Sequence, residues 1–354
     1  MEIKVELTQN PKQKVPADKL GFGNVFSDHM FIMDYQTGKG WHNPRIVPYG
    51  SIAYEPAVMV FHYGQAIFEG LKAYRTEKGE IVLFRPQENF RRLNASCDAL
   101  CIPKIDEEFA LKALMQLLTI DRDWIPDAPG TSLYIRPFII ATEPHIGVHP
   151  ANSYHFIIIT GPVGAYYKEG LNPVKIYVET KYVRAVVGGL GEVKASANYA
   201  ASLKAQMEAA AKGYTQVLWL DGVERKYVEE VGTMNVFFVI GDEIVTPMLT
   251  GSILPGITRK SCIELLRSWG LNVVERRVSI EEIFDAHEKG ILKEAFGTGT
   301  AAVISPIGEL CWNDRKIILS NGKIGELSQK LYDELTGIQY AKKPDPFNWV
   351  VKVE

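Results

Sequence analysis

A stretch rich in glycine and proline divides the chain, and predicted strands and helices lie on both sides of it. The stretch begins with the sequence GPVG at residues 161–164 and ends with Asn172-Pro173. The 354 residues are enough for two domains at roughly 150 residues each. We therefore expect a smaller N-terminal domain at residues 1–164, a linker at 165–173 and a larger C-terminal domain at 174–354.

The spacing of apolar residues predicts strands and helices in mixed order. Runs of β-branched and aromatic residues predict strands, whereas apolar residues at helical spacing before a glycine predict helices. We expect strands at 81–84, 131–140, 154–160, 174–182, 215–220, 224–228, 236–240 and 243–245. We expect helices at 88–100, 198–212, between Gly256 and Gly270, between Ser279 and Gly290, and at 323–335. Ser279 and Glu282 fit a capping box at the start of one helix, and Gly241-Asp242 fits the turn of a hairpin between the strands at 236–240 and 243–245. Strands and helices do not alternate strictly, so the expected fold class is α+β.

The charge balance and the cysteines exclude several classes of protein. The 39 Lys and Arg residues face 42 Asp and Glu residues, which leaves no basic excess for binding nucleic acid or an anionic membrane. Residues 1–14 lack the apolar region of a signal peptide, and no run approaches the ~20 apolar residues of a membrane span. Four scattered cysteines favour a reducing cytoplasm. Cys97 and Cys101 have no partners at zinc-ligand spacing, so we expect no metal site.

Two glycine-containing segments are candidates for binding one phosphate group. The glycine-rich turn at 188–194 lacks the P-loop pattern, and no G-x-G-x-x-G opens a helix, so ATP and dinucleotides are disfavoured. Residues 256–258 start a predicted helix, and residues 297–301 follow a predicted strand. The N–H groups of a helix start attract anions, and the hydroxyls of Thr258 and Thr300 add donors. Either segment alone also fits an ordinary turn.

Lys194 is the lysine whose surroundings suggest chemistry. It follows the glycine-rich turn and precedes small residues, so its amine could enter a cleft with room for a bulky adduct. Tyr199 and Glu230 supply a phenol and a carboxylate of the kind that a pyridine ring requires. Glu229 is expected on the opposite, solvated face of the extended segment that carries Glu230.

Several long motifs in a fixed order carry a family resemblance. They lie at residues 63–75 (YGQAIFEGLKAYR), 85–92, 134–137, 188–199, 230–235 and 296–301. Together they resemble the branched-chain amino acid aminotransferases, and the similarity runs from about Gly21 to Pro306. The resemblance implies the fold-type IV architecture of pyridoxal-phosphate enzymes, with two α/β domains, the cofactor between them, and a homodimer.

The resemblance also implies roles for individual residues. Lys194 matches the lysine that links covalently to pyridoxal 5'-phosphate and moves the substrate proton, and Glu230 matches the carboxylate at the pyridine nitrogen. The remaining cofactor positions are Arg92, Arg184, Tyr199, Ile257, Thr258 and Thr300. The positions around the substrate are Phe22, Tyr63, Phe68, Tyr134, Arg136, Val148, Thr233, Thr300 and Ala301.

The implied reaction moves an amino group from leucine, isoleucine or valine to 2-oxoglutarate. An apolar pocket separates such side chains by only ~1–3 kcal/mol per methylene, so all three are expected as substrates. Arg136 would bind the side-chain carboxylate of glutamate. D-amino acid aminotransferase, aminodeoxychorismate lyase and a non-catalytic phosphate-binding protein remain as alternatives. Some animal relatives have a Cys-x-x-Cys pair after the Gly-Thr-Ala turn, whereas residues 301–305 here read AAVIS.

Overall fold

The computed structural model describes residues 1–164 and 171–353, and the chain forms two compact units. Unit 1 contains Met1–Lys168, Val193–Ala197 and Gly337–Glu354. Unit 2 contains Glu169–Glu192 and Asn198–Thr336. The predicted linker at 165–173 lies mostly outside the described residues.

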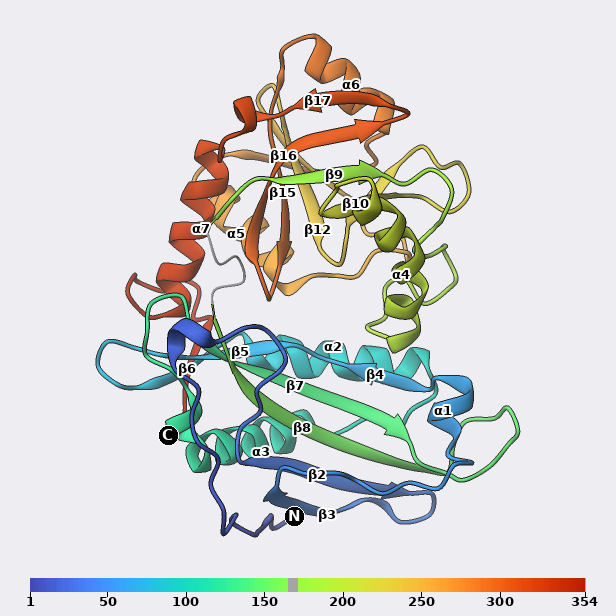
Figure 1. Cartoon of the computed structure of the whole chain (residues 1–354), viewed down its shortest axis with the longest axis vertical. Coiled ribbons are helices and arrows are strands. Elements are labelled where there is room, and N and C mark those ends of the chain that lie inside the picture. The colour runs from blue at the N-terminus through green and yellow to red at the C-terminus, as the bar shows by residue number, and fades with distance from the viewer. Residues whose placement is uncertain (165–170, 354) are drawn as a thin grey trace. The chain divides into compact units, whose positions relative to one another are not determined.

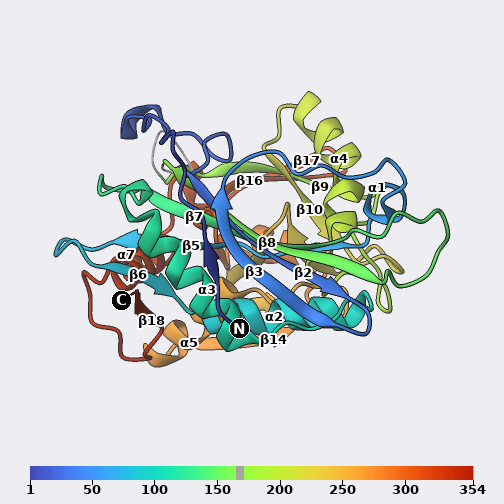
Figure 2. The ribbon, with the colours of Figure 1, turned by 90° about the horizontal axis from the view of Figure 1, so that it is seen from below.

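Unit 1 is built on a nine-stranded sheet with the order β1-β3-β2-β8-β7-β5-β6-β18, and β4 also pairs with β7 (Figure 1). Its strands are β1 Lys4–Val5, β2 His29–Gln36, β3 Gly40–Pro48, β4 Ala66–Phe68, β5 Leu71–Arg75, β6 Ile81–Phe84, β7 Ser132–Ala141, β8 Ser153–Val163 and β18 Val350–Val353. Its helices are η1 Ala17–Lys19, α1 Met59–Tyr63, α2 Pro86–Ala99, α3 Glu107–Ile120 and η2 Arg122–Trp124. Helix α3 packs against α2 and lies along β2 (Figure 1, Figure 2).

Side chains along strand β7 alternate between the core face of this sheet and its opposite face. Leu133, Ile135 and Ile139 are fully buried and belong to the core cluster shared with α2 and α3. Tyr134 and Arg136 alternate with them and therefore point to the opposite face. The same alternation on β4 buries Ile67 in the core. The opposite face of the sheet carries Tyr134 and Arg136 on β7, together with a smaller apolar cluster that contains Met30, Ile32 and Ile157.

Unit 2 is built on a second nine-stranded sheet with the order β11-β10-β9-β16-β15-β12-β13-β14, and β17 also pairs with β16. Its strands are β9 Val174–Val178, β10 Gln216–Leu220, β11 Val228–Val231, β12 Asn235–Ile240, β13 Glu243–Pro247, β14 Asn272–Arg276, β15 Leu292–Gly299, β16 Val303–Trp312 and β17 Arg315–Ile318. The remaining helices of the chain are α4 Ser196–Ala211, α5 Ile257–Ser268, α6 Ile280–Glu288, η3 Ser320–Gly322 and α7 Glu326–Gln339.

Elements with strong local signals form where the sequence predicts them. The hairpin of β12 and β13 turns at Gly241-Asp242, and Gly241 has the positive φ of 62° that glycine tolerates. The Ser279 hydroxyl accepts a hydrogen bond from the backbone N–H of Glu282 at 3.0 Å and caps α6 as expected. The α+β fold class is confirmed by the two mixed sheets and their helices.

Two predicted strands have different bounds in the structure because carboxylates turn the backbone. The strand expected at 174–182 ends at Val178, since Glu179 accepts hydrogen bonds from the N–H groups of Lys181 and Tyr182 at 2.7 and 3.0 Å. The strand expected at 224–228 begins only at Val228. There, the carboxylate of Asp221 accepts four backbone N–H groups, which belong to Val223, Glu224, Lys226 and Tyr227. Such Asx-type turns compete directly with strand pairing.

Within the described residues, no helix combines the length and the apolar character required to cross a membrane.

The core of unit 1 can be tested with two matched leucines. Leu114 on α3 is fully buried in the core cluster, whereas Leu7 is 55% exposed. Leu114→Ala should lower the free energy of unfolding by about 2–5 kcal/mol, because it removes buried methyl groups and leaves a cavity. Leu7→Ala should change it by less than about 0.5 kcal/mol. Denaturant unfolding of both variants measures the difference, and equal effects would contradict this core assignment.

Candidate functional site

In unit 1, backbone contacts fix Lys194 beside β4. The Lys194 N–H donates to the Ser96 hydroxyl of α2 at 3.2 Å, and the Lys194 carbonyl accepts from the Phe68 N–H at 3.1 Å. Ala195 forms an antiparallel bridge with Ile67. Lys194 therefore sits on a short extended segment paired with β4, which holds its Cα firmly.

The amine of Lys194 lies among groups that favour its neutral form. Its Nζ lies 4.7 Å from the centre of the Phe68 ring. The pKa of Lys194 is lowered to about 8, mainly by burial and also by the charge of Arg92, while the charge of Glu69 opposes both. An ordinary lysine has a pKa near ~10.4, so this amine is neutral far more often at physiological pH. A neutral amine can act as a nucleophile and as a base.

A buried ion pair lies beside this lysine. Glu69 is fully buried. Its two carboxylate oxygens accept hydrogen bonds from Arg92 Nε at 2.7 Å and from Arg92 Nη2 at 2.9 Å. Asn89, one turn earlier on α2, donates to Glu69 at 2.8 Å. Burial raises the pKa of Glu69, but the charge of Arg92 and these hydrogen bonds outweigh it, so the net pKa is lowered. The pair gives Arg92 a fixed direction.

The sequence analysis placed Arg92 in the site but missed Glu69. Glu69 stands between Phe68 and Gly70 in an otherwise apolar stretch. A carboxylate at such a position must find a cation when the chain folds, and this was the available signal.

Aromatic rings and an arginine form a wall on the polar face of β7. The guanidinium of Arg136 lies 4.5 Å from the Phe68 ring centre, and its Nη2 donates to the Tyr134 hydroxyl at 3.1 Å. The Phe22 ring packs edge-on against Tyr134 at 4.9 Å. Arg136 Nε is buried without a hydrogen-bond partner among the described residues. A methyl group on Gly70 would collide with the Tyr134 hydroxyl. This wall is suited to an apolar group or to a carboxylate.

The structure does not bring Tyr63 and Val148 into this cluster. Tyr63 ends helix α1, and Val148 lies in the loop of residues 142–152 between β7 and β8. Both side chains are exposed, Val148 by 86%.

In unit 2, Glu230 holds a buried cluster of hydrogen bonds. Its carboxylate accepts the Leu254 N–H at 2.9 Å and lies 3.2 Å from Nε of Arg184. Asn235 reaches the same carboxylate at 3.5 Å and the Leu254 carbonyl at 2.9 Å. Arg184 also donates to the carbonyls of Gly191, at 3.0 Å, and of Ser252. Glu230 on β11 and Arg184, which lies between β9 and α4, thus form a buried ion pair.

Glu229 is not solvated as expected. It is only 5% exposed, and the Ser252 hydroxyl donates to its carboxylate. All four residues of β11 are buried, so the alternation of the strand places Glu229 against other protein atoms rather than in water. Burial raises the pKa of Glu229, and the Ser252 hydrogen bond and the charge of Arg184 only partly oppose this.

The predicted phosphate donors also lie in unit 2. Helix α5 begins after Gly256, and no side chain caps its first N–H groups, which belong to residues around Ile257 and Thr258. Uncapped N–H groups at a helix start are suited to an anion. Thr300 and Ala301 lie in the turn between β15 and β16. Tyr199 lies on α4, and Thr233 is exposed in the turn between β11 and β12.

Each unit supplies groups that suit parts of a phosphorylated ligand. In unit 1, the guanidinium of Arg92 is suited to a phosphate. In unit 2, the start of α5 is also suited to a phosphate, and Glu230 is a buried carboxylate held by Arg184 and the Leu254 N–H. Lys194 adds an amine that burial keeps reactive.

Comparisons with known proteins agree on one family. The family model described as amino-transferase class IV matches residues 66–310. Branched-chain-amino-acid aminotransferase 2 of Bacillus subtilis (strain 168) is 60% identical over 351 residues, which are 99% of this chain and 97% of that protein. Branched-chain-amino-acid transaminase 1 of the same organism is 56% identical over 352 residues, which are 99% of each chain.

Solved structures of such enzymes share the fold. The Escherichia coli branched-chain amino acid aminotransferase superposes with a TM-score of 0.78 at 27% identity, covering 92% of this chain and 99% of that one. The Thermobaculum terrenum enzyme in its PLP form superposes with a TM-score of 0.74 at 26% identity, covering 92% and 98%.

The charge balance around Lys194 gives a direct prediction. Glu69→Gln removes the negative charge that raises the pKa of Lys194, while Arg92 still lowers it. The pKa of Lys194 should therefore fall below its wild-type value of about 8, and its neutral fraction at a given pH should rise. Labelling with an amine-reactive reagent across pH, followed by peptide mass spectrometry, measures the midpoint.

The matched control is Glu77→Gln, because Glu77 carries the same charge in unit 1 but pairs with Lys342 at the surface. Its midpoint for Lys194 should stay at the wild-type value. An unchanged or higher midpoint in Glu69→Gln would contradict the charge balance described above.

Proposed function

The chain belongs to the class IV aminotransferase family, and we propose that it transfers the amino group of leucine, isoleucine and valine to 2-oxoglutarate. The reaction yields the branched-chain 2-oxo acids and L-glutamate, and it is reversible. The observation that carries this proposal is Lys194, an amine with a lowered pKa beside the wall of Phe68, Tyr134 and Arg136. The names of the similar curated proteins support the choice of substrate class.

The cofactor that we propose is pyridoxal 5'-phosphate. The uncapped start of α5 and the fixed guanidinium of Arg92 fit its phosphate, and the buried carboxylate of Glu230 fits its pyridine nitrogen. Arg184, Tyr199, Ile257, Thr258 and Thr300 complete the proposed set. When bound, the cofactor supplies an electron sink for the electrons released at the substrate Cα.

Glu230 and Lys194 would act on two different protons, one on the cofactor and one on the substrate. Glu230, a buried side chain paired with Arg184, would hold a proton on the pyridine nitrogen, since a hydrogen bond to a carboxylate stabilises that protonated form. The neutral Nζ of Lys194 would take the proton from the substrate Cα as a general base, and the same atom would donate it again later in the reaction as a general acid. The low pKa of Lys194 makes the amine available near neutral pH, where an ordinary lysine would be protonated.

The wall in unit 1 explains how one site can bind two kinds of substrate. Phe22 and Phe68 would contact an aliphatic side chain, with Tyr63, Val148 and Thr233 as further candidates. Arg136 would bind the second carboxylate of glutamate, using donors such as the unpartnered Nε. Tyr134, with Thr300 and Ala301, would take the α-carboxylate.

We also propose that the enzyme is a cytoplasmic homodimer. Phe61 and Tyr63 on α1 and Ile146 and Val148 on the neighbouring loop are exposed apolar residues, by 62%, 38%, 72% and 86%. The bridge between Val58 and Pro144 joins the two segments, so these side chains belong to one region of unit 1. Clustered apolar exposure of this kind is typical of interaction surfaces. The four free cysteines are compatible with a reducing compartment.

A substrate screen tests the proposed reaction. The purified enzyme with added cofactor should convert L-leucine, L-isoleucine and L-valine when 2-oxoglutarate is present, and a coupled assay for glutamate measures the rate. Rates on D-alanine should be far lower. Good activity on D-alanine without turnover of L-leucine would overturn the assignment.

Lys194→Ala tests the covalent role of the lysine. After borohydride reduction of the wild-type enzyme, peptide mass spectrometry should find the cofactor mass on the peptide that contains Lys194. The variant should carry no such mass and should lose catalysis. Lys72→Ala is unsuitable as a control because Lys72 is itself buried, whereas Lys78→Ala changes a lysine in the turn between β5 and β6 and should keep both properties. A cofactor mass on another lysine of the wild type would contradict the assignment.

Arg136→Leu tests substrate choice. The variant should weaken kcat/KM for glutamate about 10- to 150-fold, which corresponds to ~1.5–3 kcal/mol for a lost charged hydrogen bond. The loss for leucine should be much smaller, since an aliphatic side chain does not use the charge. Arg91→Leu, whose guanidinium is exposed on α2, is the matched control. Equal losses for both amino acids would indicate that Arg136 has only a structural role.

A further inference from the structure

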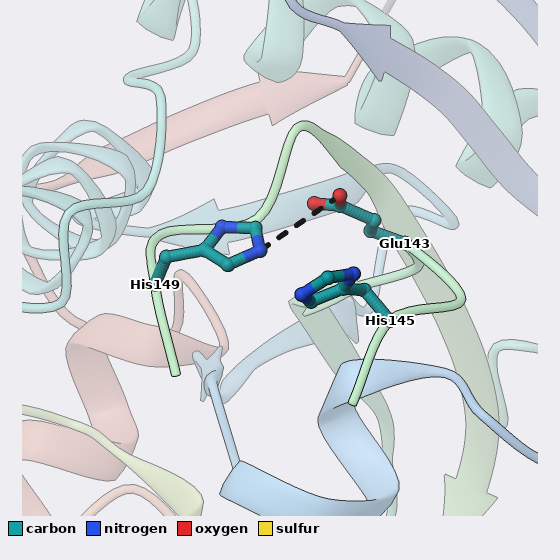
Figure 3. Close-up of side chains that lie close together, drawn as sticks. All are labelled: Glu143, His145 and His149. Carbon is teal, nitrogen blue, oxygen red and sulfur yellow. Dashed lines mark ion pairs between the residues drawn. The ribbon is translucent and has the colours of Figure 1, made fainter. Parts of the chain in front are cut away.

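Two histidines and a glutamate meet in the loop between β7 and β8. One ligand atom from each of Glu143, His145 and His149 lies within 4.8 Å of the others (Figure 3). From the sequence, only the surroundings of Cys97 and Cys101 were candidates for a metal site, and no metal site was expected. This cluster lies apart from Lys194 and its contacts, and the proposed aminotransfer does not use it.

Hydrogen bonds hold both the carboxylate and the backbone of Glu143 in place. Asn152 donates to it through its backbone N–H at 2.6 Å and through its side-chain amide at 3.3 Å. The Glu143 carbonyl accepts the N–H of Met59 at 2.9 Å.

His149 presents its Nε2 atom to this carboxylate. Its Nδ1–H donates to the Pro150 carbonyl at 2.8 Å, which fixes the tautomer. Neutral His149 therefore has its lone pair on Nε2, 3.9 Å from a carboxylate oxygen of Glu143. Two electron-pair donors that face each other at this distance leave room for a cation between them. A histidine whose other nitrogen donates to a carbonyl is also the usual arrangement of metal-bound histidine.

His145 completes a set of three. Its ring packs edge-on against the His149 ring, with the centres 4.8 Å apart. The ring folds back over Gly147, where a Cβ would come within 2.5 Å of His145 Nε2. Glycine at this position therefore allows His145 to reach its neighbours.

We propose that Glu143, His145 and His149 form a binding site for a divalent transition-metal ion, with zinc as the first choice. Two imidazoles and one carboxylate are a common ligand set for zinc, and a water molecule would fill the fourth position. Metal–ligand bonds of about 2.0–2.2 Å require the ligand atoms to move closer than they are here. The exposed tip of the loop, with Ile146 at 72%, can close on the fixed Glu143. The ion would tie the backbone on both sides of Val148.

Zinc titration of the tag-free holoenzyme tests this site. Isothermal titration calorimetry at about pH 7.5, where histidine is mostly neutral, should detect one tight zinc ion per chain. His145→Ala, His149→Ala and Glu143→Gln should each weaken binding by at least about tenfold. Glu143→Gln keeps an oxygen acceptor for Asn152 and so preserves the loop. The matched control, His287→Ala, removes a half-buried histidine of α6 in unit 2 and should leave the affinity unchanged.

Hydrogen exchange then locates the ion. Zinc should slow the exchange of amides in residues 142–152 in the wild type and not in the double variant of His145→Ala and His149→Ala. The proposal is overturned if the double variant binds zinc as tightly as the wild type, or if bound zinc leaves exchange in this segment unchanged. Neither measurement depends on activity, so failure here is distinct from failure of the proposed aminotransfer.

Discussion

The ion pair between Glu69 and Arg92 is the interaction on which the organisation of the unit 1 site depends. Two hydrogen bonds of 2.7 and 2.9 Å join a fully buried carboxylate to a guanidinium on α2. Such a pair adds little net stability over apolar packing, but removing one partner leaves a buried charge that costs about 3–5 kcal/mol. Its value here lies in placement, because it fixes α2 against the chain that follows β4. The same helix contributes Ser96, which holds the backbone of Lys194.

The strand alternation of β7 couples packing to chemistry. Leu133 and Ile135 fill the core, and this alone directs Tyr134 and Arg136 to the other face. A shift of one residue in the pairing of β7 would bury Arg136 in an apolar core and expose Ile135, so no such register competes with the native one. The hydrophobic core therefore selects the register, and the register places the residues that we propose to contact substrate. Changes in core packing along β7 are expected to reach the site through the backbone.

The sequence predicts best what is decided locally. The Ser279–Glu282 cap and the Gly241 turn each depend on residues within a few positions, and both form as expected. Lys194 and Glu230 could be found because long motifs surround them, and both lie in buried, hydrogen-bonded settings. Glu229 was misplaced because alternation along a strand does not say whether the second face is covered. Its burial depends on Ser252, 23 residues away along the chain.

Glu69 and the cluster proposed to bind a metal ion were missed for a related reason. The charge of Glu69 is compensated by Arg92, 23 positions away. The sequence around either residue does not predict which partner it pairs with. The cluster of Glu143, His145 and His149 lies within seven consecutive residues, yet its spacing matches no familiar helical or finger pattern. The loop geometry brings the three side chains together, through the Asn152 hydrogen bonds and the open backbone at Gly147.

The loop of residues 142–152 differs physically from the rest of unit 1. Its base is fixed by hydrogen bonds from Met59 to Glu143 and from Thr142 to Ser153, whereas Ile146 and Val148 at its tip are largely exposed. Exposing these two apolar side chains to water is unfavourable by about 25 cal/mol for each Å² of apolar surface. A partner surface, as in the proposed homodimer, would remove that cost. An ion held by both histidines would in addition lower the conformational entropy of the free loop, so less entropy would be lost when the tip is covered. Burial of the loop tip by a partner subunit and binding of a metal ion are thus expected to favour each other.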